Sequence, residues 1–171
     1  MKAEERRTLI LQTLLKEEKP MSASSLASKL GVSRQIIVGD IALLRAGGQN
    51  ILATPRGYLL QSQGEDQCIR RIACCHTDQQ MEEELKICVD EGCMVMDVIV
   101  EHPVYGQLTG ELELSSRYDI SQFIEKVKQQ SAHALSELTN GIHLHTLRCP
   151  NEQAYQRVCS RLKEAGILIP E

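Results

Sequence analysis

The chain has 171 residues, of which 42% are hydrophobic, and a formal net charge of −4 at pH 7. This length suits one mid-sized domain or two small ones, and no apolar run approaches the ~18–20 residues that cross a membrane. The charged N-terminus lacks the apolar core of a signal peptide, so the sequence predicts a cytoplasmic protein without a membrane span.

The charge is unevenly divided along the chain. Residues 1–61 hold nine Lys and Arg against five Asp and Glu, whereas the remainder holds ten against eighteen. The two parts therefore carry charges of +4 and −8. This asymmetry predicts a modestly basic nucleic-acid module joined to an acidic domain with a different task.

Seven cysteines occur at irregular spacings. Cys74 and Cys75 are adjacent, the total is odd and no C-x-x-C occurs, so we expect reduced, buried thiols and no disulfide framework. A zinc ion held through Cys74, Cys75 or Cys149 stays an alternative.

Three helices and a hairpin are predicted in residues 1–61. Two serines, Ser22 and Ser33, stand where N-caps are expected, and a glycine turn separates the second helix from the third. The expected elements are a helix over 4–17, a helix from Ser22 to Leu30, a helix from Ser33 up to Gly47, and strands over 51–54 and 58–60. This span resembles the winged helix-turn-helix of the biotin-repressor type. The alternative is a three-helix domain with a hairpin that contacts other proteins.

Seven polar side chains of this module are candidates for DNA contacts. The first turn of the third helix is expected in the major groove, where Arg34 and Gln35 face base edges. Serine hydroxyls at helix N-termini can donate hydrogen bonds to DNA phosphates. An arginine late in the third helix can reach the DNA backbone, and an arginine at the wing tip can reach the adjacent groove. Each residue is also compatible with an ordinary solvated position. The candidates are Ser22, Ser24, Ser33, Arg34, Gln35, Arg45 and Arg56.

One position departs from the winged-helix pattern. Domains of that type usually carry a basic residue before Asp40, where this chain has Gly39. A glycine inside a helix costs about 1 kcal/mol relative to alanine, and a phosphate contact is lost with the basic side chain. We therefore expect weak DNA binding by one monomer and a homodimer as the functional unit.

Residues 62–67 are interpreted as a polar linker, beyond which strands and helices alternate. The expected strands cover 68–75, 94–100, 108–114, 141–147 and 167–169, and the expected helices cover 77–89, 119–138 and 152–165. The order β-α-β-β-α-β, followed by α-β, predicts an α+β domain over residues 68–171, with a mostly antiparallel sheet and helices on one side.

Two histidines lie on one expected strand. Side chains alternate between the faces of a strand, so His143 and His145 share a face and lie roughly 6–7 Å apart, close enough to chelate one ion. The pair is also compatible with the polar face of a half-exposed strand. A third histidine, His76, is followed by an acidic helix, and neutral imidazole with carboxylate suits a divalent transition metal. His133, in an expected helix, is interpreted as a surface histidine.

Three fragments carry a resemblance to a known family: Cys75–Thr77, His102–Leu108 and Gly141–Leu147. Their order and spacing behind a winged helix resemble the three-histidine domain of repressors from Gram-positive and Thermotogales-type bacteria. Those repressors respond to nicotinic acid and silence genes of NAD biosynthesis or niacin uptake. The resemblance spans essentially the whole chain.

The resemblance implies one metal ion bound by four residues and an effector pocket beside His102. Glu84 lies eight residues past His76, about two helical turns into the acidic helix, and has to turn inward to join the site. Such N and O ligands accept zinc, nickel, iron or manganese. The implied metal ligands are His76, Glu84, His143 and His145.

Two further residues are candidates for the effector pocket. Tyr105 can stack on an aromatic acid, and Arg148, beyond the H-x-H strand, can pair with a carboxylate. His102 itself is also compatible with a strand-end residue held by backbone hydrogen bonds.

We therefore expect a repressor, not an enzyme, that binds double-stranded operator DNA as a homodimer. Nicotinic acid or a related pyridine carboxylate is the expected co-repressor, bound in a metal-containing regulatory domain. One alternative is a metal-dependent hydrolase with a DNA-binding appendage, although the sequence contains no H-E-x-x-H or nucleophile motif. The other is a repressor that senses the metal ion itself.

Overall fold

The computed structural model describes residues 1–61, 68–130 and 134–170. The chain divides into two compact units, Met1–Gly64 and Glu65–Glu171, and each is described by itself. The expected linker, 62–67, and the expected surface histidine, His133, lie outside the described residues.

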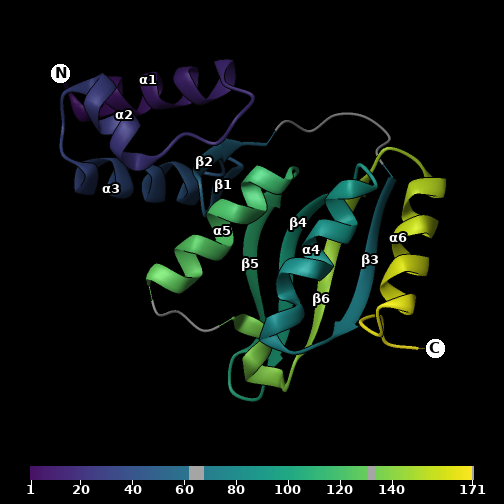
Figure 1. Cartoon of the computed structure of the whole chain (residues 1–171). Coiled ribbons are helices and arrows are strands. Elements are labelled where there is room, and N and C mark those ends of the chain that lie inside the picture. Colours follow the sequence, from purple (N-terminus) through teal and green to yellow (C-terminus); the bar gives the residue numbers. More distant parts are fainter. Residues whose placement is uncertain (62–67, 131–133, 171) are drawn as a thin grey trace. The chain divides into compact units, whose positions relative to one another are not determined.

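The N-terminal unit has three helices followed by a hairpin, which is the winged helix-turn-helix arrangement (Figure 1). Ser22 and Ser33 cap the second and third helices, because their hydroxyls accept hydrogen bonds from the backbone N–H groups of Ser25 and Ile36. The elements are α1 (Ala3–Lys16), α2 (Ala23–Leu30), α3 (Arg34–Ala46), β1 (Ile51–Thr54) and β2 (Gly57–Leu60).

Side chains from the three helices and from β1 form the hydrophobic core of this unit. Beside this core, the Asp40 carboxylate of α3 accepts a hydrogen bond from Arg6 Nε of α1 at 2.5 Å. A buried carboxylate needs such a partner, so this pair fixes α1 against α3. The buried apolar side chains are Ile10, Leu14, Ala23, Leu26, Ala27, Ile37, Ile41 and Ile51.

Replacing Gly39 by alanine should stabilise the N-terminal unit. Gly39 lies in the interior of α3, and a Cβ built there meets nothing within 4 Å. Alanine therefore adds helix propensity without a clash, and we expect a gain of about 1 kcal/mol in the free energy of unfolding. Amide hydrogen exchange in α1–α3 measures it. The matched control is Ala42→Gly, at an exposed position of the same helix, which should lower the same free energy by a similar amount. Equal exchange in Gly39→Ala and the parent chain would contradict the expectation.

The C-terminal unit is an antiparallel four-stranded sheet with helices on one face. Its strand order is β3-β6-β4-β5, so β6 lies between two strands that precede it in the chain. The α+β fold with an antiparallel sheet, expected from the sequence, is confirmed. The elements are β3 (Cys68–Cys75), a 3-10 turn η1 (Asp78–Gln80), α4 (Met81–Asp90), β4 (Met94–His102), β5 (Gly106–Leu114), α5 (Arg117–Gln129), a 3-10 turn η2 (Leu135–Thr139), β6 (Ile142–Cys149) and α6 (Glu152–Glu164).

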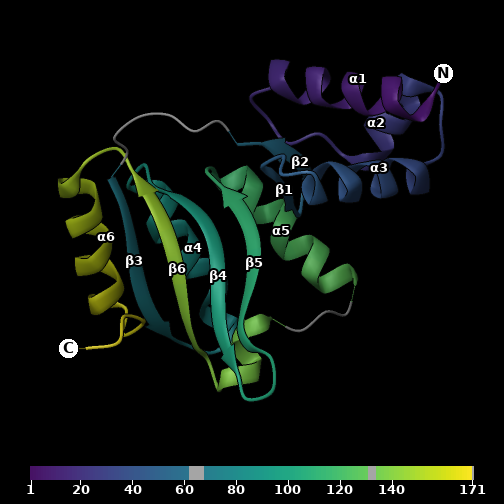
Figure 2. The same ribbon diagram turned by 180° about the vertical axis from the view of Figure 1, so that it is seen from behind.

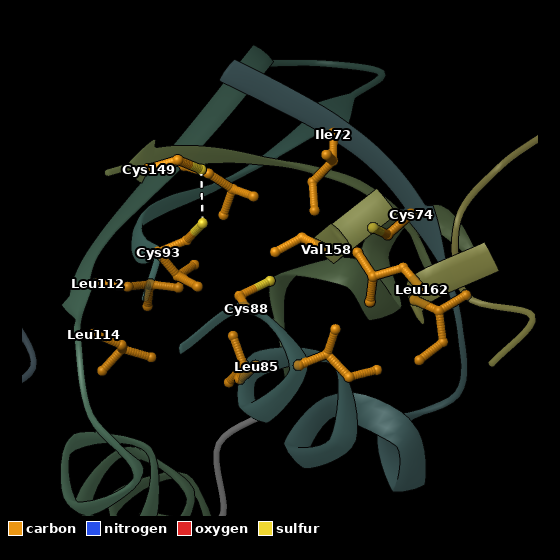
Figure 3. Close-up of a cluster of buried hydrophobic side chains, with 14 of the residues drawn as sticks. Ile72, Cys74, Leu85, Cys88, Cys93, Leu112, Leu114, Cys149, Val158 and Leu162 are labelled. Carbon is orange, nitrogen blue, oxygen red and sulfur yellow. Dashed lines mark hydrogen bonds between the residues drawn. The ribbon is translucent and has the colours of Figure 1, made fainter. Parts of the chain in front are cut away.

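Helices α4, α5 and α6 cover one face of this sheet, and Figure 2 shows the opposite face with the strands in front. Leu85 of α4, Ile120 of α5 and Leu162 of α6 meet strand residues in one buried cluster. Figure 3 shows part of this core, where Cys93 and Cys149 point toward one another, with a sulfur–sulfur distance of 2.7 Å. All seven cysteines are free thiols.

The main differences from the sequence-based expectation concern three elements, whereas the ends of the others shift by at most two residues. The helix expected over 119–138 ends at Gln129, because the next positions of its apolar stripe, 130 and 131, hold glutamine and serine, and a separate 3-10 turn follows from Leu135. The helix expected from 77 begins with a 3-10 turn before α4. The strand expected over 167–169 is reduced to an isolated bridge between Leu168 and Cys74.

No helix in the part of the chain that the structure describes is long and apolar enough to cross a bilayer.

Candidate metal centre

Three histidine rings converge on the carboxylate of Glu84. His76 Nε2 lies 2.5 Å from Glu84 Oε2, and His143 Nε2 lies 3.0 Å from Glu84 Oε1. His145 Nε2 lies 3.4 Å from Oε2. The side chains are 1–4% exposed, so this cluster of four residues, the His3Glu cluster, is almost completely removed from water.

The other ring nitrogen of each histidine is held by a backbone carbonyl. Nδ1 of His76, His143 and His145 lies 2.6–2.8 Å from the carbonyl oxygens of Thr77, Gly141 and Asp97, respectively. A carbonyl oxygen only accepts, so each Nδ1 carries the proton and donates it. The Nε2 atoms of all three rings therefore face Glu84, where each donates a hydrogen bond when protonated and offers a lone pair to a metal ion when neutral. This is the arrangement that orients imidazole ligands in metal sites.

Two of the three histidine–glutamate separations match the distances between neighbouring ligands of one metal ion, and the third, between His76 Nε2 and Glu84 Oε2, is shorter at 2.5 Å. Two ligand atoms that each lie about 2.1 Å from an ion are about 3.0 Å apart at a right angle and about 3.4 Å apart at a tetrahedral angle. The His143–Glu84 and His145–Glu84 distances of 3.0 and 3.4 Å fall on these values. Three imidazoles and one carboxylate form an N3O donor set, which zinc, nickel, iron and manganese all accept. The residues present therefore fit one divalent transition metal ion.

Burial and charge oppose each other in this cluster. Burial lowers the pKa of His76 and of His145, but the Glu84 carboxylate outweighs it, and the net pKa of each ring is raised. Burial raises the pKa of Glu84, but the three histidines outweigh it and hold that pKa well below its ordinary value. The site thus keeps the Glu84 carboxylate ionised in the interior, and this negative charge favours a positive charge beside the Nε2 atoms. A divalent cation bound there would supply that positive charge.

Local structure explains how the four side chains meet. The alternation of β6 directs His143 and His145 to the helix-covered face, where they line up with Leu147. His76 follows β3 directly, and β3 pairs with β6 so that Cys74 lies opposite His143. Glu84 is on the face of α4 that packs on the sheet, whereas Glu83 is exposed and Glu82 pairs with Lys86 at 2.7 Å.

Among the cysteines, Cys74 alone of the three candidates lies beside this cluster. Its Sγ, a Glu84 carboxylate oxygen and a His143 ring nitrogen all lie within 4.8 Å of one another. Cys75, the next residue, is exposed and points toward the carbonyl of Asn140. Cys149 is at the far end of β6, opposite Cys68.

The effector candidates do not all come together. His102 ends β4 at the same end of the sheet as His143, since Ile99 pairs with Leu144. Its ring lies 5.0 Å from that of Tyr105, and its Nδ1 accepts hydrogen bonds from backbone N–H groups in the hairpin. Tyr105 is 75% exposed.

Arg148 lies opposite Met94 at the start of β4, so the length of that strand separates it from His102. One chain therefore does not form a single pocket from all three effector candidates.

The DNA-contact candidates divide into three groups. Ser24, Arg34, Gln35 and Arg45 are exposed. Ser22 and Ser33 act as helix caps through their hydroxyl oxygens, and the Ser22 hydroxyl also shares a hydrogen bond with that of Ser25 at 2.9 Å. Arg56 is half-buried in the two-residue turn between β1 and β2.

Sequence reasoning did not single out Asp97, which supports the cluster from β4. Its carbonyl accepts from His145, and its carboxylate accepts from the backbone N–H of Thr146 at 2.8 Å. The signal available was a lone carboxylate inside the apolar run from Met94 to Val100.

The fold and the site define the class of protein: a transcription regulator with a winged helix-turn-helix unit and a second domain that holds a buried histidine–glutamate cluster. Residues 69–171 match the family model described as the 3H domain, and residues 6–59 match that of an HTH domain. The chain therefore belongs to the 3H domain family.

Two similar relatives cover nearly the whole chain. The "Transcription repressor NadR" of Bacillus subtilis is 45% identical over 169 residues, which is 97% of this chain and 94% of the relative. The "Probable transcription repressor NiaR" of Thermotoga maritima is 41% identical over 168 residues, 98% of this chain and 95% of the relative. Like these relatives, the protein is a transcription repressor.

Proposed function

We propose that this repressor controls genes of NAD biosynthesis or niacin uptake in the cytoplasm, as a homodimer on operator DNA, with nicotinic acid as co-repressor. We also propose that His76, Glu84, His143 and His145 hold one divalent transition metal ion. The observation that carries the metal proposal is the convergence of three Nε2 atoms on one buried carboxylate. The relatives' names and the two matched families support the repressor function.

The chain's residues take distinct roles in this proposal. The backbone carbonyls of Thr77, Gly141 and Asp97 fix the three rings, so that the ligand geometry is set before any ion binds. When bound, the ion would supply positive charge and an open coordination position to a carboxylate oxygen. His102 and Tyr105 present a pair of rings at the same end of the sheet, where an aromatic acid can stack.

Regulation requires two global states that the co-repressor distinguishes. A dimer of winged helices binds two half-sites only at the spacing that the DNA dictates. A ligand of the C-terminal unit can therefore act by favouring one dimer geometry over another, and only to the extent that it binds that geometry more tightly.

A titration with operator DNA tests the proposal. With the metal-loaded protein, nicotinic acid should tighten operator binding by about 5–150-fold, the range of ordinary allosteric coupling. Nicotinamide and quinolinate at the same concentration are the comparison ligands. Unchanged operator affinity with and without nicotinic acid would contradict the co-repressor role, and full operator binding restored by metal alone would make the ion itself the signal.

Arg34→Ala should weaken operator binding without affecting the C-terminal unit. Arg34 is the first residue of α3 and is exposed, as expected for a side chain that reaches base edges. Loss of one base-specific arginine contact costs about 1–3 kcal/mol, so we expect at least a fivefold weaker operator complex and a relaxed preference at one base pair. Fluorescence anisotropy with operator variants measures both. Lys163→Ala, which removes an exposed charge from α6, should leave the affinity unchanged.

A further inference from the structure

Cys74 is a buried thiol beside the His3Glu cluster that the proposed ligand set does not use. It lies on β3, is 0% exposed, and stands directly opposite His143 in the β3–β6 ladder. Directly opposite residues of an antiparallel pair project to the same face, so the thiol and the imidazole point into the same space. The Cys74 sulfur, a Glu84 oxygen and a His143 nitrogen all lie within 4.8 Å of one another.

This span is close to that of one coordination shell. A metal–sulfur bond is about 2.3 Å long and a metal–nitrogen or metal–oxygen bond about 2.1 Å, so two such ligands on one ion are at most about 4.4 Å apart. The span of 4.8 Å exceeds this largest separation by about 0.4 Å, so a shared ion requires the Cys74 thiol to move toward the other ligands by at least that amount. Figure 3 shows Cys74 apart from Cys93 and Cys149, so its sulfur is not part of that thiol pair.

Charge supplies an independent reason for a sulfur ligand. A divalent ion with Glu84 and three neutral imidazoles leaves a net charge of +1 in a site whose side chains are at most 4% exposed. Burying an uncompensated charge is costly. An ion deprotonates a thiol that coordinates it, and one thiolate brings the site without effector to zero charge.

We propose that Cys74 is a fifth ligand of the metal centre and that it selects a thiophilic divalent ion, such as zinc, nickel or cobalt, over manganese. Sulfur ligands favour the softer ions, whereas nitrogen and oxygen ligands alone discriminate less. The inference rests on the metal centre proposed above and adds one ligand, together with the metal preference that follows from it.

The test is a titration of the full chain, freed of metal and fully reduced, with cobalt(II) under anaerobic conditions. Visible d–d bands report that cobalt is bound, and a near-ultraviolet sulfur-to-cobalt charge-transfer band reports a thiolate ligand. We expect both signals at one equivalent of cobalt in the parent chain. The control variant, Cys75→Ser, replaces the exposed cysteine next to Cys74 on β3 and should show both signals as well. Cys74→Ser should keep the d–d bands, lose the charge-transfer band and bind cobalt about 10–100-fold more weakly. Competition between zinc and manganese should favour zinc less strongly in Cys74→Ser than in Cys75→Ser.

The outcomes separate this inference from the proposed function. Bound cobalt with d–d bands but no charge-transfer band in the parent chain would remove Cys74 from the ligand set and leave the His3Glu site intact. Persistence of the band in Cys74→Ser would do the same. Absence of cobalt binding in the parent chain would overturn the metal centre itself. Because a missing charge-transfer band in the parent chain alone would overturn the inference, it stays testable even where Cys74→Ser does not fold.

Discussion

Glu84→Gln should abolish metal-dependent co-repression. The glutamine keeps the size of the side chain but removes the negative charge that faces three Nε2 atoms. Loss of a residue that merely orients a ligand costs about 10–100-fold in metal affinity, so loss of the central carboxylate should cost at least about 100-fold. Isothermal titration with zinc or nickel measures the affinity, and operator binding should no longer respond to nicotinic acid.

The control for this variant is Glu83→Gln, which removes the same charge from the exposed neighbour on α4. Its metal affinity and its nicotinate response should equal those of the parent chain. A ligand that binds only the folded state raises the unfolding temperature, so saturating metal should stabilise the parent chain and Glu83→Gln but not Glu84→Gln. Equal metal affinities in the two variants would contradict the assignment of Glu84.

Gly141→Ala should disrupt the C-terminal unit at the point where His76 meets β6. Gly141 has φ +89°, and a Cβ there would lie 2.4 Å from the carbonyl oxygen of His76. Two costs combine: an L-residue in the left-handed region costs roughly 1–2 kcal/mol, and a contact with backbone atoms is not relieved by rotating a side chain. We expect a loss of at least about 3 kcal/mol in the free energy of unfolding, and weaker metal binding because His76 must move away.

Gly166→Ala separates the two costs. Gly166 also has a positive φ, +71°, but a Cβ there meets nothing within 4 Å. This variant should lose only the roughly 1–2 kcal/mol of backbone strain and keep the metal affinity of the parent chain. Urea unfolding, followed by far-ultraviolet circular dichroism, measures the stabilities of both. Similar losses in Gly141→Ala and Gly166→Ala would show that the approach of His76 to Gly141 contributes little.

Local patterns predicted the N-terminal unit well because its structure is set by short-range interactions. The serine caps and the glycine turn depend on backbone groups within a few residues. Ser22 and Ser33 accept the hydrogen bonds expected of N-caps, and helices α2 and α3 begin one residue after them. The end of α5 was predicted too late, because polar residues after Val127 still have fair helix propensity, and only packing decides whether such a segment stays helical.

The positions of the effector candidates could not be predicted from the sequence, because a motif does not reveal which strand residues pair with one another. Arg148 lies five residues beyond His143 and appeared close to the site in the sequence. A strand rises about 3.3 Å per residue, so those five residues carry it well away from the cluster, to the level of Met94.

The sequence by itself determined what local chemistry dictates: the winged helix-turn-helix elements, the antiparallel α+β order, and the shared face of His143 and His145, which follows from the period of two in any strand. The tertiary structure decided which distant segments meet. Only the insertion of β6 between β3 and β4 brings His76, Cys74 and the carbonyl of Asp97 to that histidine pair. Only the packing of α4 on the sheet turns Glu84, and not Glu83, into the interior. Strand order and helix rotation depend on contacts between residues far apart in the chain, such as Cys75 and Asn140, which are 65 positions apart, and no local pattern carries that information.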